Sequence, residues 1–345
     1  MKIAICSDIH FCQYSSILRS RGKRFSTRLE NCIACINEFE QFSEENNCDL
    51  EIFCGDFFDK EVLNAEELSA LKEINWNNIS KKFLVGNHEL GNNDLTYNSL
   101  NALTKIGDII DKPFFILDNS CNIFLIPYIV ETNRKDLIDY INAFEHSIDK
   151  NKPNVIFAHS DISGIQYGMF ESKNGFTLSE IENNTLFYLD GHLHNTASYN
   201  TKTGNIVLLG NLTGLNFSED ASKYRHFMYL LDTDILFLDE KECINALKFY
   251  KLCIDDNNLN IIEALPLNSV VSIKTSKNIL DKVKESVNKN KNIIESRITL
   301  IPDINIVNNS DISEIVSKDH IQQFKDYILK TLGTSDLIED EINNL

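Results

Sequence analysis

Short apolar runs alternate with amphipathic stretches along the first two thirds of the chain. The runs cover residues 2–7, 50–55, 82–86, 123–127, 155–159 and 186–191. Each run has the length of a buried strand, and between several of them apolar side chains recur at helical spacing, as in residues 25–45 and 65–74. Strands that alternate with helices predict an α/β fold in which helices cover layered sheets.

Helical spacing fades after Gly191, where a series of strands is expected. These strands are predicted at residues 197–200, 205–210, 226–232 and 235–239. The Thr203-Gly204 step is typical of a hairpin turn between the first two.

The chain changes character from about Ile244. A strand at 270–274, a helix at 276–288 and a strand at 298–301 predict a small α+β unit. Apolar residues then recur at helical spacing over 321–332 and 337–345, which predicts a helical tail. We therefore expect three parts, which are residues 1–244, 245–316 and 317–345.

Composition limits the class of protein. A chain of 345 residues that is 43% apolar can bury one large core and a smaller second one. The sequence has neither a secretion signal nor a segment apolar enough to cross a bilayer, so we expect a soluble, cytoplasmic protein without membrane contact. Its nine cysteines, including the Cys32–Cys35 pair within a predicted helix, are expected to be reduced core thiols.

The net charge of −18 argues against a protein that binds nucleic acid over its whole surface. Any DNA contact must therefore be local. Basic residues cluster from Arg19 to Arg28 and from Lys274 to Lys291. For the first cluster, which follows a strand end, phosphate contact and plain solvation remain open alternatives, and for the second the simpler alternative is a solvated face.

Polar residues that can bind metals follow directly after the apolar runs. These residues are Asp8, His10, Asp56, Asn87, His88, His159, His192 and His194. The carboxyl ends of strands are where open α/β sheets gather their sites, so the side chains should converge. Asp8 and His10 are two residues apart, as are His192 and His194, and that spacing places both side chains of a pair on one side of an extended segment.

The donor set suits a pair of cations. Carboxylate, amide oxygen and imidazole ligands favour a hard or borderline divalent metal ion, and the Asp56 carboxylate could bridge two of them. Two adjacent cations can activate water and neutralise charge on a phosphoester, so the sequence predicts a two-metal phosphoesterase.

The motifs resemble those of the calcineurin-like metallophosphoesterases over residues 1 to about 240. The matching segments are Ser7-Asp8-Ile9-His10, Gly55-Asp56-Phe57-Phe58-Asp59, Gly86-Asn87-His88-Glu89, Ala158-His159 and Gly191-His192-Leu193-His194. Within that family the Gly-Asp-Phe-Phe-Asp segment and the Gly210-Asn211-Leu212 turn are most similar to SbcD-type nuclease subunits and their phage counterparts. The resemblance implies a β-sandwich flanked by helices, a small capping domain and a helical tail.

The resemblance also implies residue roles. Asp8, His10 and His194 would bind one metal ion, and Asn87, His159 and His192 the other. Asp56 would bridge the two ions, which in this family would be manganese or, alternatively, magnesium. His88 would protonate the leaving oxygen, a role that suits imidazole near neutral pH.

Two positions depart from the pattern of the family. Glu89 stands where many of these nucleases have aspartate, which leaves open which neighbour orients His88. Ala158 replaces the glycine that usually precedes the fourth-motif histidine, and His159 is still expected to reach the metal ion.

These features predict a metal-dependent DNA exo/endonuclease subunit that works with an SbcC-type ATPase in recombination or repair. The protein is expected to form a homodimer. It would lie in the host cytoplasm if it is encoded by a phage. The tail helices would dock on the ATPase or pack on their own domain, since an amphipathic pattern does not identify its partner. A phosphatase or cyclic-nucleotide phosphodiesterase is an alternative with the same site. A non-catalytic scaffold that binds DNA ends is an alternative of another class.

Overall fold

The computed structural model describes residues 1–301 except residues 19, 168 and 169. Residues Met1–Thr299 form one compact unit. The predicted tail helices at 321–332 and 337–345 lie outside the described residues. Within the described part of the chain, none of the helices has the length and apolar character that crossing a membrane requires.

The first of two six-stranded sheets contains the amino-terminal strand. Its strand order is β18-β17-β1-β2-β3-β6. The parallel strands are β1 (Lys2–Cys6), β2 (Leu50–Phe53), β3 (Ser80–Leu84) and β6 (Asp108–Ile110). β17 (Phe227–Asp232) runs antiparallel to β1, and β18 (Phe237–Glu242) runs antiparallel to β17. Residues more than 200 positions apart in the sequence therefore share one sheet.

The second six-stranded sheet also contains four parallel strands. Its order is β15-β16-β14-β9-β8-β7. The parallel strands are β8 (Asn122–Ile126), β9 (Asn154–Ala158), β14 (Phe187–Asp190) and β16 (Asn205–Leu208). The outer strands, β7 (Phe114–Leu117) and β15 (Ala197–Asn200), are antiparallel to their neighbours.

Alternating side chains on the strands build two different cores. Ile3 and Ile5 of β1 belong to a buried cluster that also contains Leu125 and Phe157 of the second sheet, so this cluster fills the space between the sheets. Ala4 and Cys6 of β1 instead belong to the cluster that packs against a helix. The result is a β-sandwich with a helix-covered face, which confirms the predicted layered α/β class.

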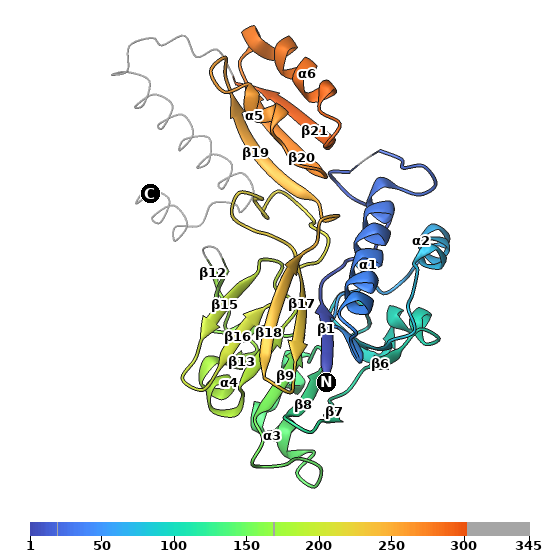
Figure 1. Cartoon of the computed structure of the whole chain (residues 1–345), viewed down its shortest axis with the longest axis vertical. Coiled ribbons are helices and arrows are strands. Elements are labelled where there is room, and N and C mark those ends of the chain that lie inside the picture. Colours follow the sequence, from blue (N-terminus) through green and yellow to red (C-terminus); the bar gives the residue numbers. More distant parts are fainter. Residues whose placement is uncertain (19, 168–169, 302–345) are drawn as a thin grey trace, which may run out of the picture. The chain divides into compact units, whose positions relative to one another are not determined.

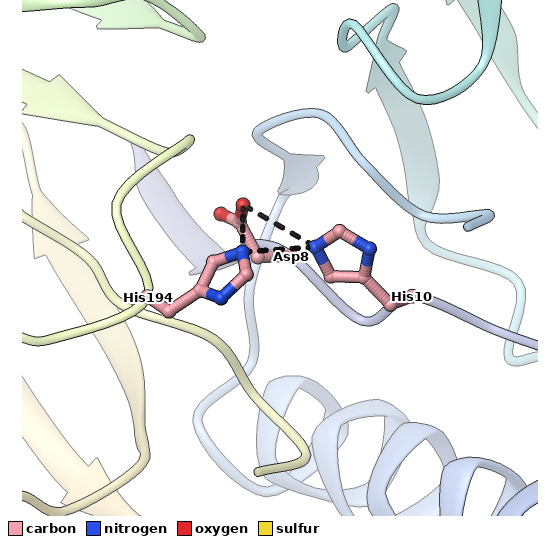
Figure 2. Close-up of side chains that lie close together, drawn as sticks. All are labelled: Asp8, His10 and His194. Carbon is pink, nitrogen blue, oxygen red and sulfur yellow. Dashed lines mark hydrogen bonds and ion pairs between the residues drawn. The ribbon is translucent and has the colours of Figure 1, made fainter. Parts of the chain in front are cut away.

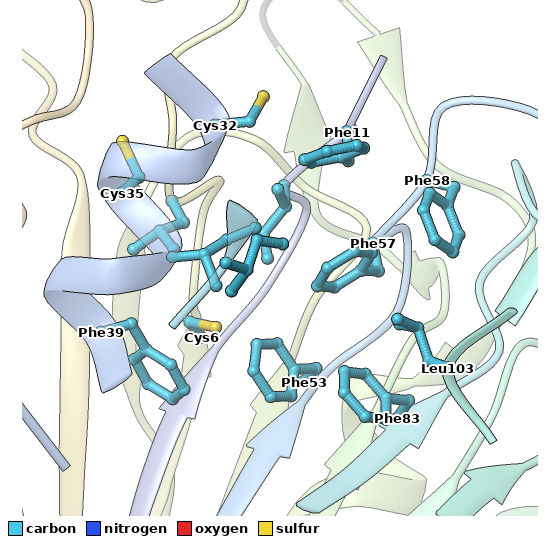
Figure 3. Close-up of a cluster of buried hydrophobic side chains, with 14 of the residues drawn as sticks. Cys6, Phe11, Cys32, Cys35, Phe39, Phe53, Phe57, Phe58, Phe83 and Leu103 are labelled. Carbon is cyan, nitrogen blue, oxygen red and sulfur yellow. The ribbon is translucent and has the colours of Figure 1, made fainter. Parts of the chain in front are cut away.

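The helix on that face is α1 (Thr27–Glu45), which lies alongside β1 in Figure 1. Ser26 caps it by accepting a hydrogen bond from the Leu29 amide. Cys32, Cys35 and Phe39 of α1 are fully buried, and the Phe39 ring lies 5.2 Å from that of Phe53 on β2 (Figure 3). All nine cysteines are free thiols and all but Cys253 are buried, so the expectation of core thiols is confirmed for eight of them.

The second sheet carries shorter helices on its outer face. α3 (Leu137–Asn142) and α4 (Leu178–Asn184) contribute Leu137 and Ile181 to a cluster with Ile156 of β9. Thr177 and Glu180 form a capping box that begins α4. α2 (Ala65–Ala70) begins with a similar box formed by Asn64 and Glu67.

The remaining short elements lie in the connections. The strands are β4 (Leu90–Gly91), β5 (Asp94–Asn98), β10 (Ile162–Ser163), β11 (Gln166–Tyr167), β12 (Phe170–Glu171) and β13 (Phe176–Thr177). The 3-10 helices are η1 (Leu71–Glu73), η2 (Ser99–Leu103), η3 (Glu131–Asn133) and η4 (Lys277–Ile279).

A three-stranded sheet with its own apolar cluster follows β18. Its order is β19-β20-β21, formed by β19 (Lys248–Ile254), β20 (Ser269–Thr275) and β21 (Ile293–Leu300), with α5 (Asn260–Glu263) and α6 (Leu280–Lys289). Buried residues of this cluster include Ile262, Val271 and Val283. Several details differ from the sequence prediction. β19, which contains lysines among its apolar residues, and α5 were not predicted. The helix predicted at 276–288 forms as η4 followed by α6, and β21 begins five residues before the predicted 298.

Candidate functional site

In the first sheet, candidate ligands follow three adjacent parallel strands. Asp8 follows β1, Asp56 follows β2, and Asn87 and His88 follow β3. Backbone hydrogen bonds join the segments beyond the strand ends, because the Asp8 amide donates to the Gly55 carbonyl at 3.1 Å and the His10 amide donates to the Asp56 carbonyl at 3.0 Å. The loop after β1 is therefore fixed in position relative to the loop after β2.

The second sheet contributes histidines from two adjacent parallel strands. His159 follows β9, and His192 and His194 follow β14. Contacts across the sandwich join the two sheets here, since the His192 amide donates to Asp8 Oδ2 at 3.0 Å and His159 Nδ1 lies 2.8 Å from the Cys54 carbonyl oxygen. The structure thus brings together the site residues that the sequence singled out.

Several site residues have backbone conformations that are uncommon for residues other than glycine. Asp8, His10, Asp56 and His192 have φ angles of 51°, 48°, 48° and 69°. Each such residue costs roughly 1–3 kcal/mol and usually occurs where function requires it. Glycine makes room beside them, because a Cβ at Gly86 would lie 2.2 Å from Asp56 Oδ1.

Asp8, His10 and His194 form one group of converging donor atoms (Figure 2). The Nε2 atoms of His10 and His194 lie 3.1 Å apart, and they are 3.9 Å and 3.8 Å from Asp8 Oδ1. Asp8 is fully buried, and its Oδ1 accepts no hydrogen bond from the described residues. A cation between these atoms would satisfy all three, so this group fits a divalent metal ion.

A second group consists of Asp56, His159 and His192. His159 Nε2 is 3.2 Å from Asp56 Oδ2, and Asn87 Oδ1 lies 3.1 Å from His159 Nε2 and 3.0 Å from His192 Nδ1. Nitrogen and oxygen atoms that can donate electron pairs again face one another at short range. This group also fits a divalent cation.

The Asp56 carboxylate connects the two groups. Its Oδ2 is 3.9 Å from His10 Nε2 as well as 3.2 Å from His159 Nε2, and its Oδ1 accepts the His88 amide at 3.0 Å. Only 1% of Asp56 is exposed, so its charge interacts with the surrounding imidazoles through little water. The geometry allows this carboxylate to be shared between two cations.

The electrostatics of the site reflect these close contacts. Burial by itself would favour neutral side chains, but the pairing of His159 with Asp56 raises the pKa of His159 to about 10 and lowers the pKa of Asp56 below its usual range. Burial dominates at His194 and lowers its pKa to about 4.

His88 lies at the edge of the site with 42% of its side chain exposed. Its Nδ1 is 3.2 Å from the Asp59 carbonyl oxygen and 3.8 Å from Asp59 Oδ1, and its ring is perpendicular to that of His10 at 4.8 Å. His10, Asp56 and His88 also form a third group of nearby donor atoms.

Asp59, rather than Glu89, is the carboxylate beside His88. Asp59 also contacts His10, whose Nδ1 lies 2.9 Å from Asp59 Oδ1. Glu89 is fully buried and accepts hydrogen bonds from the amides of Gly86 and Phe58, at 2.6 Å and 3.0 Å. Glu89 therefore stabilises the turns after β2 and β3 through these hydrogen bonds.

Two further carboxylates were not identified from the sequence. Asp161 Oδ1 is 3.4 Å from His192 Nε2, and Glu219 Oε1 is 3.8 Å from His194 Nδ1. Asp161 comes two residues after His159, which was a usable signal. Glu219 lies in a loop without any motif, so sequence spacing could not have found it.

The first basic cluster does not form one surface. Arg28 is 2% exposed and donates to the carbonyl oxygens of Gly214 and Ile9, at 2.9 Å and 2.8 Å. Of the two alternatives for this cluster, phosphate contact and solvation, neither applies to Arg28, because its guanidinium forms hydrogen bonds with the loops that contain the site residues. Arg21 and Arg24 are exposed and form ion pairs with acidic residues. In the second basic cluster, the lysines from Lys274 to Lys291 are also exposed.

Comparisons with known proteins agree with this geometry. Residues 1–201 match the family model of the calcineurin-like phosphoesterases. The SbcD component of the nuclease SbcCD from Staphylococcus epidermidis is 27% identical over 249 residues, which cover 64% of this chain and 63% of that protein. The match thus spans less than two thirds of that relative's length.

Solved structures were also found. A dimetal phosphatase from Danio rerio has a TM-score of 0.48 at 12% identity, with 70% of this chain and 95% of that chain covered. An archaeal phosphodiesterase has a TM-score of 0.37 at 15% identity, with 70% and 99% covered. Because the family model matches more than half of the sequence, this chain belongs to the calcineurin-like phosphoesterases, hydrolases that act on phosphoesters with divalent metal ions.

Proposed function

We propose that this protein is the nuclease component of a DNA-processing complex and hydrolyses DNA phosphodiester bonds as an exo/endonuclease. The observation that carries the proposal is the pair of donor groups that share Asp56. Two adjacent cations suit a diester, in which both the attacking and the leaving oxygen develop charge. The nuclease name of the staphylococcal relative supports a nucleic acid as the substrate.

The described residues divide naturally between two cations. Asp8, His10 and His194 would hold one, Asn87, His159 and His192 the other, and Asp56 both. Manganese or magnesium would supply the Lewis acidity that neutralises phosphate charge and activates water. The mixed set of imidazole and oxygen donors suits manganese better than magnesium, which prefers oxygen ligands alone.

His88 is proposed to donate a proton to the leaving oxygen. Its exposed side chain can reach a bound substrate, and the contact of Nδ1 with Asp59 leaves Nε2 to donate. Asp59 would hold the ring in position because it contacts both His88 and His10.

The remainder of the chain is proposed to serve DNA and partner binding. We retain the division into residues 1–244, a capping domain at 245–316 and a tail at 317–345. The whole tail lies outside the described residues. The tail would dock on an SbcC-type ATPase, and the protein would act as a homodimer. The name of the staphylococcal relative, which is one component of the nuclease SbcCD, supports an assembly of several chains.

A phosphatase of the same family is the second candidate, and the net charge of −18 favours it because a strongly acidic surface repels DNA. The two candidates are distinguished by giving the purified protein, with manganese, end-labelled linear duplex DNA and an aryl phosphomonoester. The nuclease should degrade the DNA and cleave the monoester poorly.

His88→Ala tests the chemistry of the proposed nuclease. We expect DNA cleavage to fall by roughly 10²–10⁴-fold, the usual contribution of a general acid, while metal content measured by mass spectrometry is retained. The matched control is His146→Ala, since His146 has a 95% exposed side chain and lies outside the site. Equal DNA cleavage by wild type and His88→Ala would remove the role assigned to His88.

A further inference from the structure

A pocket with a volume of about 390 Å³ adjoins the Asp8–His10–His194 group. His192 and His194 form one of its walls, so the pocket and the proposed metal site share these side chains. Sites for small molecules usually measure roughly 300–1,000 Å³, so this pocket suits one ring system better than a longer segment of substrate.

The rest of the wall combines apolar and aromatic side chains. Ala197 and Tyr199 are two residues apart on β15, so they share one face of the strand, and Leu208 of β16 pairs directly with Ala197. The small Ala197 side chain leaves space beside Tyr199, which is 39% exposed. Tyr224 lines the same pocket from the loop before β17.

Polar residues complete the lining of the pocket. These residues are Asn195, Thr196 and Ser218. The pocket therefore combines aromatic rings with polar groups, which matches a nucleobase.

We propose that this pocket binds the nucleobase of the nucleotide whose phosphodiester is cleaved, with Tyr199 and Tyr224 in contact with the base. The proposal rests on the proposed function and specifies the substrate class as nucleoside phosphodiesters. A base held beside His194 would position the adjoining phosphate at the donor groups. Tyr199 and Tyr224 are thus residues that determine specificity.

The experiment compares two diesters with the same leaving group. Thymidine 5′-(p-nitrophenyl phosphate) carries a base, whereas bis(p-nitrophenyl) phosphate does not, and nitrophenolate release reports on both. We expect Tyr199→Ala and Tyr224→Ala to lower the ratio of kcat/KM for the thymidine ester to that for the bis-aryl ester by roughly 5- to 100-fold, as expected for the loss of base stacking. The loss should fall mainly on KM.

Two further variants separate stacking from general damage. Tyr224→Phe keeps the ring and should keep most of the preference for the thymidine ester. Phe237→Ala is the control, because it removes a 56% exposed aromatic ring that does not line the pocket. Phe237 lies on β18 and pairs with Asp232, which in turn pairs with Lys2 of β1. The ratio of kcat/KM values for the two esters should equal that of wild type.

A binding measurement makes the test independent of catalysis. The fluorescence of a dinucleotide that contains 2-aminopurine should be quenched by the metal-free wild type and less by the double variant Tyr199→Ala, Tyr224→Ala. If both esters are hydrolysed with equal ratios in all variants, and quenching is also equal, the pocket does not bind the base although the proposed function stands. If neither ester is hydrolysed, the proposed function fails, and the quenching alone decides on the pocket.

Discussion

Two regions beside the first sheet gather buried or half-buried ionisable side chains, and they differ in how those side chains are paired. At the carboxyl ends of the strands, Asp8 Oδ1 and the Nε2 atoms of His10 and His194 face one another, and Asp8 Oδ1 accepts no hydrogen bond from the described residues. Elsewhere in the same sheet, the buried Lys81 on β3 forms ion pairs with Glu40 and Glu51 at 3.1 Å and 2.9 Å.

In the second region the lysine lies between the two carboxylates, although Glu40 Oε1 accepts no hydrogen bond from the described residues. Asn77 accepts a hydrogen bond from Lys81 Nζ at 2.7 Å and donates one to Glu51 Oε1 at 2.7 Å. Ion pairs formed within the protein join α1 to the strands, whereas carboxylate and imidazole atoms that face one another indicate a place for a metal ion. Burial alone therefore does not distinguish a structural ion cluster from a binding site.

The largest effect is expected from Asp56→Asn, because Asp56 belongs to both donor groups. Metal content should fall, and hydrolysis of bis(p-nitrophenyl) phosphate should drop by at least about 100-fold. Manganese should raise the melting temperature of wild type but not that of the variant, since only bound metal adds stability. Asp139→Asn on the exposed side of α3 is the control, and equal manganese binding by Asp56→Asn would contradict the shared site.

The next largest effect is expected from Lys81→Met, which leaves Glu40 and Glu51 without their cation. The free energy of unfolding should fall by roughly 3–5 kcal/mol, measured by urea denaturation without metal. Lys150→Met, at an exposed position, should change it by less than about 0.5 kcal/mol. A loss below about 1 kcal/mol for Lys81→Met would show that this cluster does not stabilise the fold.

A smaller effect, visible only with changing pH, is expected from Glu40→Gln. Burial and the neighbouring Glu51 charge raise the pKa of Glu40 to about 8, above its usual value near 4.3. The folded state therefore holds a proton that the unfolded chain releases, so stability is full below about pH 4 and declines as pH rises through 8. Denaturation between pH 6 and 9 should show a flatter decline for Glu40→Gln than for wild type and for the exposed control Glu44→Gln. Equal slopes for all three proteins would contradict the raised pKa.

Much of the fold could be predicted from local patterns. Short apolar runs located the strands that precede Asp8, Asp56 and His159, because strands buried on both faces need apolar side chains at successive positions. β19 was missed because Lys248 and Lys251 interrupt its run. Lys248 is nevertheless 9% exposed, since its stem packs inside while its ammonium group reaches the Ile244 carbonyl.

The candidate site was predictable only in part. The sequence identified donors at strand ends, but it could not show that Asp59 contacts both His10 and His88, or that Glu219 approaches His194. It also grouped Arg28 with surface cations, although Arg28 is buried and binds loop carbonyls. These contacts join residues far apart in the chain, and spacing within a segment carries no information about them.

The sequence by itself determined the donor chemistry and its place at the ends of strands, because side-chain type and periodicity are local properties. The tertiary structure alone decided that two sheets bring those ends together, that four site residues take left-handed backbone conformations, and that Tyr199 and Tyr224 line a pocket beside His194. The reason is that packing of the two sheets and the long loop connections sets distances between segments that are separated by up to about two hundred residues.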